Sequence, residues 1–365
     1  MIRTVRVELG RRGYDVRIGS GLLATLGETA AALDDVSSVV VIADATVADH
    51  YGETGVDALR SAGIATKLLT FAPGEASKTL RTYAALVDGL LEPGGDRPAA
   101  DRQMLIVAMG GGVTGDLAGF VAATVLRGVR FVQCPTTLLA DVDSAVGGKT
   151  GVDHPAGKNL IGAFHQPSAV LIDVGTLGTL PDAELRNGLA ECVKHAVIRD
   201  AELLEFIEDR AEAVFARDDD TLSELVARNV AIKAAVVVAD EREQGQRAHL
   251  NFGHTVGHAI EADAGYAVSH GQGVALGMIA EAELAVRRGL LGRDAAGRLR
   301  NVLGRLGLPV RRGDLNAERL WPIMQRDKKV RGGKVRFVLP TALGAVDVFD
   351  DVTADELAEA LKIIM

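Results

Sequence analysis

The amino-acid sequence predicts a two-domain protein in which an α/β domain precedes a mainly α-helical domain. The chain has 365 residues, more than the roughly 250–300 at which a single hydrophobic core usually stops growing. Its first half alternates short apolar runs with helix-like segments, whereas long Ala-, Leu- and Glu-rich stretches dominate the second half. We therefore expect one domain over residues 1–180 and a second over residues 181–365.

The expected α/β domain begins with a hairpin and continues with buried strands. Residues 4–9 and 14–18 alternate polar and apolar side chains around Gly13 and predict two paired strands. Residues 39–42 and 104–107 are short, continuous apolar runs, as expected for parallel strands buried on both faces. Apolar residues at helical spacing from Leu117 onward predict a helix after the second run.

The second half predicts helices and one late pair of strands. The helices are expected at 183–198, 201–216, 221–240, 254–264 and 271–289, and the strands at 335–339 and 345–348.

One segment of the first half, 92–98, contains several Gly and Pro residues and is predicted to be a surface loop. No internal repeat is found in the sequence.

Composition excludes several classes of function. The net charge is −9 and no basic cluster is present, which disfavours nucleic-acid binding. No apolar run approaches the roughly 18–20 residues that span a bilayer, so no membrane association is expected. Cys134 and Cys192 are the only cysteines and stand far apart, which disfavours a disulfide framework and fits a reducing cytoplasm. An anionic substrate would require cations gathered locally.

A glycine-rich segment, Gly110 to Asp116, lies between a predicted strand and a predicted helix. Glycines there allow a pyrophosphate to approach backbone N–H groups at the start of the helix. The spacing is not G-x-G-x-x-G, and Asp44, the best candidate for a ribose-binding acid, precedes the segment. A nucleotide-binding loop and a tight strand-to-helix turn therefore both remain possible interpretations.

Three histidines and a glutamate suggest a metal site. His254 and His258 stand four residues apart on one helix face, with His270 downstream and Glu191 upstream. Two imidazoles and a carboxylate form a three-ligand site with an open position, as in catalytic zinc centres. Spacing alone allows either helix histidine to be the ligand, and each histidine taken singly is more typical of a core or surface residue. The absence of H-E-x-x-H disfavours a metalloprotease.

Lysines flanked by glycines indicate an anion-binding region. Lys149 follows two glycines and Lys158 follows one. Such glycine-rich segments are unsuited to a helix surface but can bind an anion through the lysine and the backbone N–H groups. Lys194 stands three residues after Glu191, on the same helical face. Lys194 and Lys233, taken singly, are more typical of a solvated helix surface.

Five longer segments carry a family resemblance. They are GGGVTGDLAGFVAA, RGVRFVQCPTTLLADVDSAVGGKTGVDHPAGKNLIGAFHQP, GLAECVKHAVI, DEREQGQRAHLNFGHTVGHAIE and RDKKV. Together they resemble the 3-dehydroquinate synthase family from about residue 70 to the C-terminus, and the block from Arg127 to Pro167 is the most specific of them. The resemblance implies conversion of 3-deoxy-D-arabino-heptulosonate 7-phosphate to 3-dehydroquinate and phosphate, the second step of the shikimate pathway.

The resemblance also implies the cofactors and the course of the reaction. NAD oxidises the C5 hydroxyl of the substrate while one divalent ion, Zn²⁺ or Co²⁺, stabilises the alkoxide. The ketone acidifies the neighbouring C–H, phosphate leaves by β-elimination, the hydride returns, the ring opens and an intramolecular aldol reaction closes the carbocycle. NAD is regenerated in each turnover, and the fold is a nucleotide-binding α/β domain followed by a helical metal-binding domain.

The family's functional positions can be carried over onto this sequence. The metal ligands would be Glu191, His254 and His270, and Arg127 would reach the phosphate site of a second subunit in a homodimer. The groups that hold the substrate would be Asp143, Lys194, Lys233, Asn251 and His258, with a phosphate cradle of Arg127, Lys149, Asn159, Arg247 and Lys328 (or its neighbour Lys329). The NAD contacts would be Asp44, Glu75, Lys78, Gly112, Val113, Thr114, Gly115, Asp116, Thr136, Thr137, Lys149, Lys158, Thr176 and Thr179.

One departure and three alternatives accompany this interpretation. Gln272 stands where the family usually has glutamate, which affects only the surroundings of the metal.

The chain could instead be another sugar-phosphate cyclase, which differs at a few substrate-facing positions. It could also be a metal-dependent alcohol or glycerol dehydrogenase, although these have no reason to keep the lysine-rich phosphate cradle. A catalytically inactive NAD-binding module is the third alternative, disfavoured by the retention of the polar groups.

Overall fold

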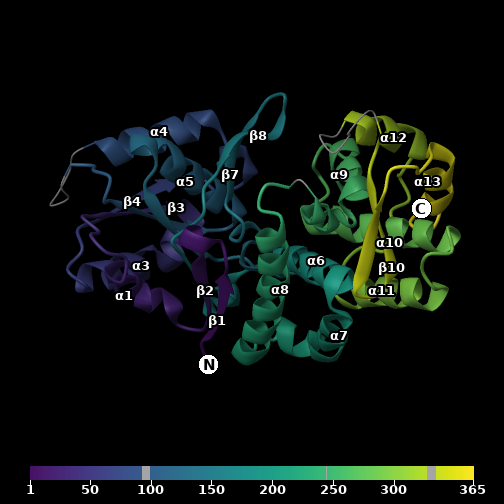
Figure 1. Cartoon of the computed structure of the whole chain (residues 1–365), viewed down its shortest axis with the longest axis horizontal. Coiled ribbons are helices and arrows are strands. Elements are labelled where there is room, and N and C mark those ends of the chain that lie inside the picture. The colour runs from purple at the N-terminus through teal and green to yellow at the C-terminus, as the bar shows by residue number, and fades with distance from the viewer. Residues whose placement is uncertain (93–98, 244, 327–333) are drawn as a thin grey trace. The chain divides into compact units, whose positions relative to one another are not determined.

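The computed structural model describes residues 1–92, 99–243, 245–326 and 334–365 (Figure 1). The chain divides into two compact units. Unit 1 comprises Met1–Leu180 and Arg217–Val238, and unit 2 comprises Pro181–Ala216 and Ala239–Met365. The expected domains 1–180 and 181–365 differ from this division in one respect, since the long helix α8 (Asp219–Ala239) groups with unit 1. The predicted loop at 92–98 lies almost wholly outside the described residues.

Unit 1 is built on a seven-stranded sheet. The order is β1-β2-β9-β6-β5-β3-β4, and every neighbouring pair is parallel except β1 with β2. The predicted N-terminal hairpin is confirmed by the antiparallel pairing of β1 with β2, and the two apolar runs form the central strands β3 and β5. The strands are β1 (Arg3–Val7), β2 (Tyr14–Gly19), β3 (Val39–Asp44), β4 (Thr66–Phe71), β5 (Leu105–Gly110), β6 (Arg130–Pro135) and β9 (Ala169–Asp173).

Helices cover both faces of this sheet. Val40 and Ile42 of β3 pack into one core with residues of α4 (Leu80–Leu91) and α5 (Gly112–Thr124). Val39 and Val41 point the other way, into a core shared with α1 (Leu26–Ala31) and α3 (Glu53–Ser61). Because successive side chains of a strand alternate between faces, a strand buried on both faces must be apolar throughout. This requirement explains the continuous apolar runs in the sequence.

Shorter elements complete unit 1. An antiparallel hairpin of β7 (Lys149–His154) and β8 (Gly157–Phe164) forms a separate two-stranded sheet. The remaining pieces are α2 (Ala45–Val47) and the short helical turns η1 (Gly10–Arg12), η2 (Leu22–Thr25), η3 (Ala48–Gly52), η4 (Glu75–Ser77), η5 (Val125–Arg127), η6 (Ala140–Ser144) and η7 (Val174–Thr179).

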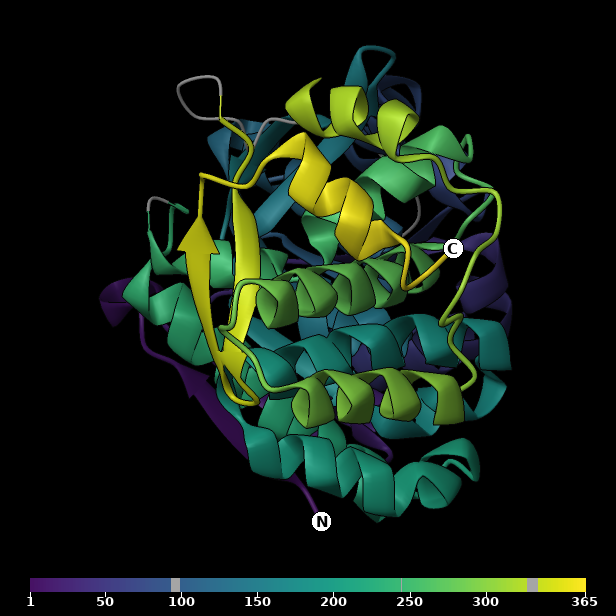
Figure 2. The ribbon, with the colours of Figure 1, turned by 90° about the vertical axis from the view of Figure 1, so that its right-hand side faces the viewer.

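Unit 2 is mainly helical and is organised around α10 (His270–Arg287). This helix packs against α6, α9, α11, α13 and β10 (Figure 2). Residues around almost its whole circumference are therefore buried. The helices and strands expected from the sequence in this region are confirmed, whereas α11, α12 and α13 were not anticipated. The other elements are α6 (Asp182–Arg199), α7 (Ala201–Phe215), η8 (Gln246–Asn251), α9 (His254–Asp263), α11 (Arg293–Arg305), α12 (Ala317–Arg326), β10 (Phe337–Ala342), β11 (Ala345–Phe349) and α13 (Ala354–Leu361). Within the described parts of the chain, no helix combines the length and apolarity needed to cross a membrane.

Unit 1 contains one buried acid without compensation. Asp141 of η6 is fully buried, and neither of its carboxylate oxygens has a hydrogen-bond partner among the described residues. The neighbouring carboxylate of Asp173 accepts N–H groups from Gly21, Leu23 and Gly175 at 2.9, 2.9 and 3.0 Å. Burial, together with the charge of Asp173, raises the pKa of Asp141 well above its ordinary value.

The raised pKa of Asp141 predicts a pH-dependent loss of stability. The folded protein retains a proton that the unfolded chain releases near the ordinary Asp pKa of 3.8. The stabilisation that Asp141 contributes is fully present below pH 3.8. It is lost as the pH rises from there through the raised pKa of Asp141 in the folded protein. Asp141→Asn should remove this slope, so its advantage in thermal midpoint over the wild type should grow from pH 5 to pH 9. The exposed control Asp49→Asn should follow the wild type; parallel curves for Asp141→Asn and wild type would contradict the prediction.

Candidate active site

The carboxyl ends of the parallel strands bring most predicted cofactor residues of unit 1 to one edge of the sheet. Asp44 ends β3, Gly110 ends β5 and Thr136 follows β6. The Thr136 N–H donates to the Gly110 carbonyl at 3.1 Å, which ties two of these strand ends together. Thr176 lies in η7, directly after β9. Ligands of open α/β sheets bind outside the carboxyl ends of the strands, so this edge suits a nucleotide.

The glycine-rich segment forms a tight turn into α5. The helix begins at Gly112, and its N-cap Gly111 provides no side-chain hydrogen bond. The first N–H groups of α5 therefore suit an anion. A Cβ at Gly110 would lie 2.4 Å from the Thr114 hydroxyl oxygen, so the turn excludes any side chain there. The two interpretations of this segment are thus compatible, since the turn is tight and also presents backbone donors.

Lys78 connects predicted cofactor residues to the predicted phosphate cradle. Its Nζ donates to Asp116 Oδ2 and to Asn159 Oδ1, both at 2.6 Å. Burial lowers the pKa of Lys78, but Asp116 outweighs burial and raises it. Glu75 lies 3.4 Å from the exposed Lys158 in an ion pair. A pocket of about 490 Å³ is lined by residues that include Glu75, Lys78 and Asp153.

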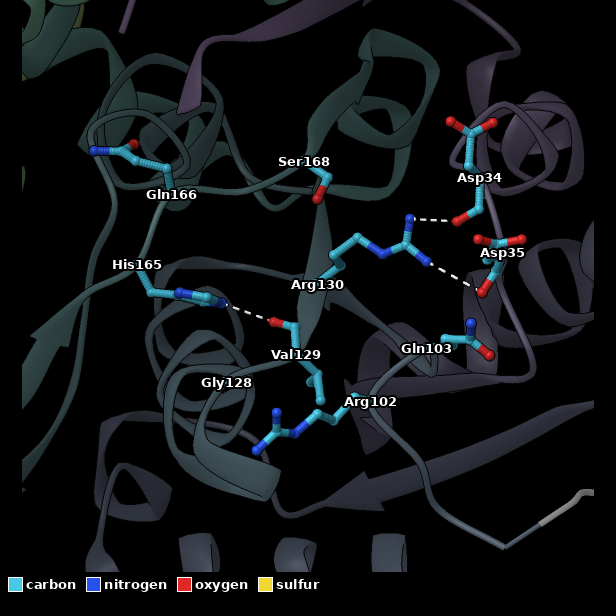
Figure 3. A pocket seen from close by; sticks show the side chains of 10 residues that line it. All are labelled: Asp34, Asp35, Arg102, Gln103, Gly128, Val129, Arg130, His165, Gln166 and Ser168. Atoms are coloured by element: carbon cyan, nitrogen blue, oxygen red, sulfur yellow. Dashed lines mark hydrogen bonds between the residues drawn. The ribbon is translucent and has the colours of Figure 1, made fainter. Parts of the chain in front are cut away.

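A second pocket, of about 590 Å³, lies at the opposite edge of the sheet (Figure 3). Its lining includes Gln103, Arg130 and Ser168, which precede or begin β5, β6 and β9. The Arg130 guanidinium donates to the backbone carbonyls of Asp34 and Asp35 at 2.6 and 3.3 Å. None of the predicted site residues lines this pocket, so it is separate from the nucleotide edge.

In unit 2, three helices bring the predicted metal ligands together. Glu191 comes from α6, His254 from the start of α9 and His270 from the start of α10. Glu191 Oε1 lies 3.5 Å from His254 Nε2 and 3.3 Å from His270 Nε2. Glu191 is fully buried, and its Oε1 atom has no hydrogen-bond partner among the described residues. Three ligand atoms thus converge as a divalent ion requires.

Hydrogen bonds orient both imidazoles for this role. His254 Nδ1 lies 3.0 Å from the Phe252 carbonyl, and His270 Nδ1 lies 3.2 Å from Glu261 Oε1. A nitrogen that donates to an oxygen carries the proton, which leaves Nε2 with the lone pair that a metal needs. Glu261 was not anticipated from the sequence, although it stands seven residues after His254, on the same face of the helix.

A second possible ligand set consists of His258, Glu261 and His270. It would use Glu261 as a ligand and would remove that carboxylate from its position behind the His270 imidazole. The set with Glu191 and His254 uses Nε2 of both histidines and keeps Glu261 as the orienting partner. The described geometry therefore favours His254 over His258, which spacing alone left open.

The charges around the cluster keep its carboxylate ionised. Burial raises the pKa of Glu191, but Lys194, His254 and His270 outweigh burial and hold it well below its ordinary value. Burial lowers the pKa of His270, but the Glu191 and Glu261 carboxylates beside it outweigh burial and raise it to about 10. Lys194 Nζ also donates directly to Glu191 Oε2. The donor atoms fit a divalent metal, whose binding would release the second proton of the His270 ring.

A close contact between α9 and α10 places the histidines. Gly253 has a φ of 78°, and a Cβ on Gly277 would lie 1.9 Å from the Gly253 carbonyl oxygen. The two helices therefore meet backbone to backbone. The imidazole centroids of His254 and His270 lie 5.3 Å apart, and those of His254 and His258 lie 5.2 Å apart. The short distance between the helices is what allows one ion to be shared between them.

The other predicted substrate residues fall into two groups. In unit 1, Lys233 Nζ donates to the backbone and side-chain oxygens of Asp143, while Arg127, Lys149 and Asn159 are exposed. In unit 2, Arg247 and Asn251 lie in η8, which directly precedes the turn into α9, and Arg247 is almost fully buried. Lys328 and Lys329 lie outside the described residues. Gln272, the departure noted above, accepts the Ser269 N–H at 3.2 Å and so caps the start of α10.

Solved structures define the class to which this fold and site belong. A 2-epi-5-epi-valiolone synthase from Streptomyces hygroscopicus, solved with NAD⁺ and Zn²⁺ bound, matches with a TM-score of 0.86 and 31% identity over 96% of each chain. A 2-deoxy-scyllo-inosose synthase complexed with carbaglucose-6-phosphate, NAD⁺ and Co²⁺ matches with a TM-score of 0.88 and 26% identity over 100% of each chain. A glycerol dehydrogenase from Schizosaccharomyces pombe shares the fold, with a TM-score of 0.68 and 17% identity over 96% of this chain and 88% of that one. The chain therefore has the fold of the sugar-phosphate cyclases.

The family follows from the sequence comparisons. The chain matches the 3-dehydroquinate synthase N-terminal model over residues 68–187 and the C-terminal model over residues 188–330. It is 46% identical to a 3-dehydroquinate synthase from Synechococcus sp. (strain CC9605), covering 98% of this chain and 96% of the relative. It is 48% identical to one from Symbiobacterium thermophilum, covering 98% and 99%. This chain belongs to the 3-dehydroquinate synthase family, as its motifs led us to expect.

The contact between α9 and α10 generates a prediction about Gly277. Gly277→Ala should destabilise unit 2 by about 1–3 kcal/mol or more. The added methyl group would clash with the backbone of Gly253, which cannot move aside as a flexible side chain could. It should also weaken Zn²⁺ binding, since the helices must move apart. Thermal unfolding and titration with Zn²⁺ measure the two effects.

Gly297 supplies the matched control for Gly277. It lies inside α11, and a Cβ there meets no atom within 4 Å. Gly297→Ala should raise stability by about 1 kcal/mol through helix propensity and leave Zn²⁺ binding unchanged. Equal behaviour of the two variants would show that the close contact does not control the position of the histidines.

Proposed function

We propose that this chain catalyses the conversion of 3-deoxy-D-arabino-heptulosonate 7-phosphate to 3-dehydroquinate and phosphate, with NAD and one divalent ion, Zn²⁺ or Co²⁺. Membership of the 3-dehydroquinate synthase family carries this proposal. The cluster of Glu191, His254 and His270 supports it, since the donor atoms suit such an ion. The neighbouring cyclases solved with NAD⁺ and with Zn²⁺ or Co²⁺ support the choice of cofactors.

The residues of this chain would divide the work between binding the cofactors and holding the substrate. When bound, NAD supplies reversible hydride transfer, and the divalent ion supplies Lewis acidity beside a substrate hydroxyl. Glu191, His254 and His270 would hold the ion. The predicted NAD residues at the carboxyl edge of the unit 1 sheet would hold the dinucleotide, with its pyrophosphate at the start of α5.

The remaining polar groups would bind and orient an acyclic substrate that must cyclise. The groups proposed to hold its hydroxyls and carboxylate are Asp143, Lys194, Lys233, Asn251 and His258. Lys149, Asn159 and Arg247 would hold its phosphate through charge-assisted hydrogen bonds and release it after elimination. Fixing the geometry of a flexible chain reduces the entropic part of the barrier to ring closure.

We also propose that the protein is a homodimer and acts in the cytoplasm. Leu126 and Arg127 have φ values of 50° and 67°, uncommon for residues with a side chain. This backbone presents an exposed Arg127, which supports its predicted reach toward the phosphate cradle of a second subunit. Cys134 and Cys192 are buried and neither forms a disulfide, which suits a reducing compartment.

The proposed reaction predicts that NAD acts catalytically. Purified protein with Zn²⁺ and substrate should release phosphate and dehydroquinate in equal amounts, many times exceeding a sub-stoichiometric supply of NAD. Absorbance from NADH should not rise at steady state, because the hydride returns to the same molecule. A chelated sample is the control and should be inactive until Zn²⁺ or Co²⁺ is restored. Accumulation of one NADH per product would support the alcohol dehydrogenase alternative instead.

The proposed ligand set predicts different effects for the three clustered histidines. His254→Ala or His270→Ala should lower Zn²⁺ affinity by at least about 100-fold, since each removes one of three protein ligands. His258→Ala should keep the metal and lose turnover. Metal content after dialysis measures the first effect, and the exposed His50→Ala variant is the control. If His258→Ala loses the metal and His254→Ala retains it, the set of His258, Glu261 and His270 is the correct one.

A further inference from the structure

Glu281 is a buried carboxylate that the proposed reaction does not use. It lies on α10, eleven residues after His270, and is fully buried. Its Oε2 accepts the N–H of Gly253 at 2.6 Å, and its Oε1 accepts the N–H of Val256 at 3.3 Å. These donors flank His254 in the sequence and belong to the first turn of α9. A side chain of one helix thus binds the otherwise unpaired N–H groups of another.

The bond to Gly253 connects Glu281 to the imidazole of His254 through one peptide group. The Gly253 N–H and the Phe252 carbonyl belong to the same peptide unit, and His254 Nδ1 lies 3.0 Å from that carbonyl. The N–H and C=O of a trans peptide point in opposite directions, and no cis peptide occurs in the described residues. A carboxyl oxygen that accepts the N–H polarises the peptide and strengthens acceptance by its carbonyl.

This chain of contacts affects the nitrogen that faces the proposed metal. A stronger bond from Nδ1–H to the Phe252 carbonyl holds the proton on Nδ1 and leaves Nε2 with its lone pair. It also fixes the plane of the ring, whose Nε2 lies 3.5 Å from Glu191 Oε1. A carboxylate behind a ligating histidine commonly acts directly on the ring, as Glu261 does for His270 at 3.2 Å. For His254, the backbone of the Gly253 turn stands between the two.

We propose that Glu281 is a positioning residue for the metal centre, acting on His254 through the Phe252–Gly253 peptide. The two proposed histidine ligands would then each have a carboxylate behind them, Glu261 directly and Glu281 through the backbone. The inference rests on the proposed function in one respect, since it requires His254 to be a metal ligand. Replacing the carboxyl group of Glu281 by an amide should weaken the metal site without removing any ligand.

The test compares Glu281→Gln with Glu283→Gln. Glu283 is also buried on α10, but it pairs with Arg287 at 2.9 Å, away from the start of α9. Competition with a chromophoric chelator should show Zn²⁺ binding about 10–100-fold weaker in Glu281→Gln and unchanged in Glu283→Gln. The visible spectrum of the Co²⁺ form should change in Glu281→Gln alone. The ¹⁵N resonances of His254 should show less Nδ1–H tautomer in that variant, which a merely structural role would not produce.

Several outcomes separate this inference from the proposed function. If wild-type protein binds Zn²⁺ and His254→Ala binds it equally well, the ligand assignment has failed and Glu281 has no site to position. If His254→Ala loses the ion but Glu281→Gln binds it with wild-type affinity and spectrum, the ligand stands and the inference is overturned. Should Glu281→Gln not fold, Glu281→Asp decides the question. That variant keeps a carboxyl group but shortens its reach to the Gly253 N–H, and an unchanged Zn²⁺ affinity and Co²⁺ spectrum would likewise overturn the inference.

Discussion

The close approach of α9 to α10 is the constraint on which the histidine cluster depends. Gly253 and Gly277 bring the two backbones within a distance that no side chain tolerates, and the proposed ligands His254 and His270 begin the two helices. The same contact brings Glu281 to the first turn of α9 and Glu261 to the ring of His270. Because α10 also packs against α6, which carries Glu191, a displacement of one helix would move the whole donor set.

Buried acids in this protein show two different solutions to the cost of burying charge. Glu191 is surrounded by Lys194 and two imidazoles, which stabilise its ionised form in spite of full burial. Asp141 has no comparable partner among the described residues, so burial stabilises its neutral form. A carboxylate must be deprotonated to act as a metal ligand. Glu191 meets this condition in spite of its burial, whereas Asp141 does not.

Unit 1 places its candidate site by topology rather than by close helix packing. Parallel strands end at one edge, so Asp44, Gly110, Thr136 and Thr176 are neighbours although they are widely separated in sequence. Lys78 then bonds to Asp116 at the start of α5 and to Asn159 on the β7–β8 hairpin. One buried cation thereby joins the cofactor edge to the phosphate cradle that we propose.

The sequence by itself determined β1, β2, β3 and β5 of the central sheet, the helices of unit 2 up to α10 and the family, because these depend on local periodicity and on contiguous motifs. It also indicated a His- and Glu-containing cluster, in which spacing left His254 and His258 equivalent and the family resemblance assigned His254 to the metal. The tertiary structure gives the two histidines different surroundings, since Glu191 and the Phe252 carbonyl lie beside His254. The grouping of α8 with unit 1 and the roles of Glu261 and Glu281 were likewise not readable from the sequence. Each of these features depends on residues that are distant in the chain or on how a helix is rotated about its axis. Such contacts leave no local pattern in the sequence.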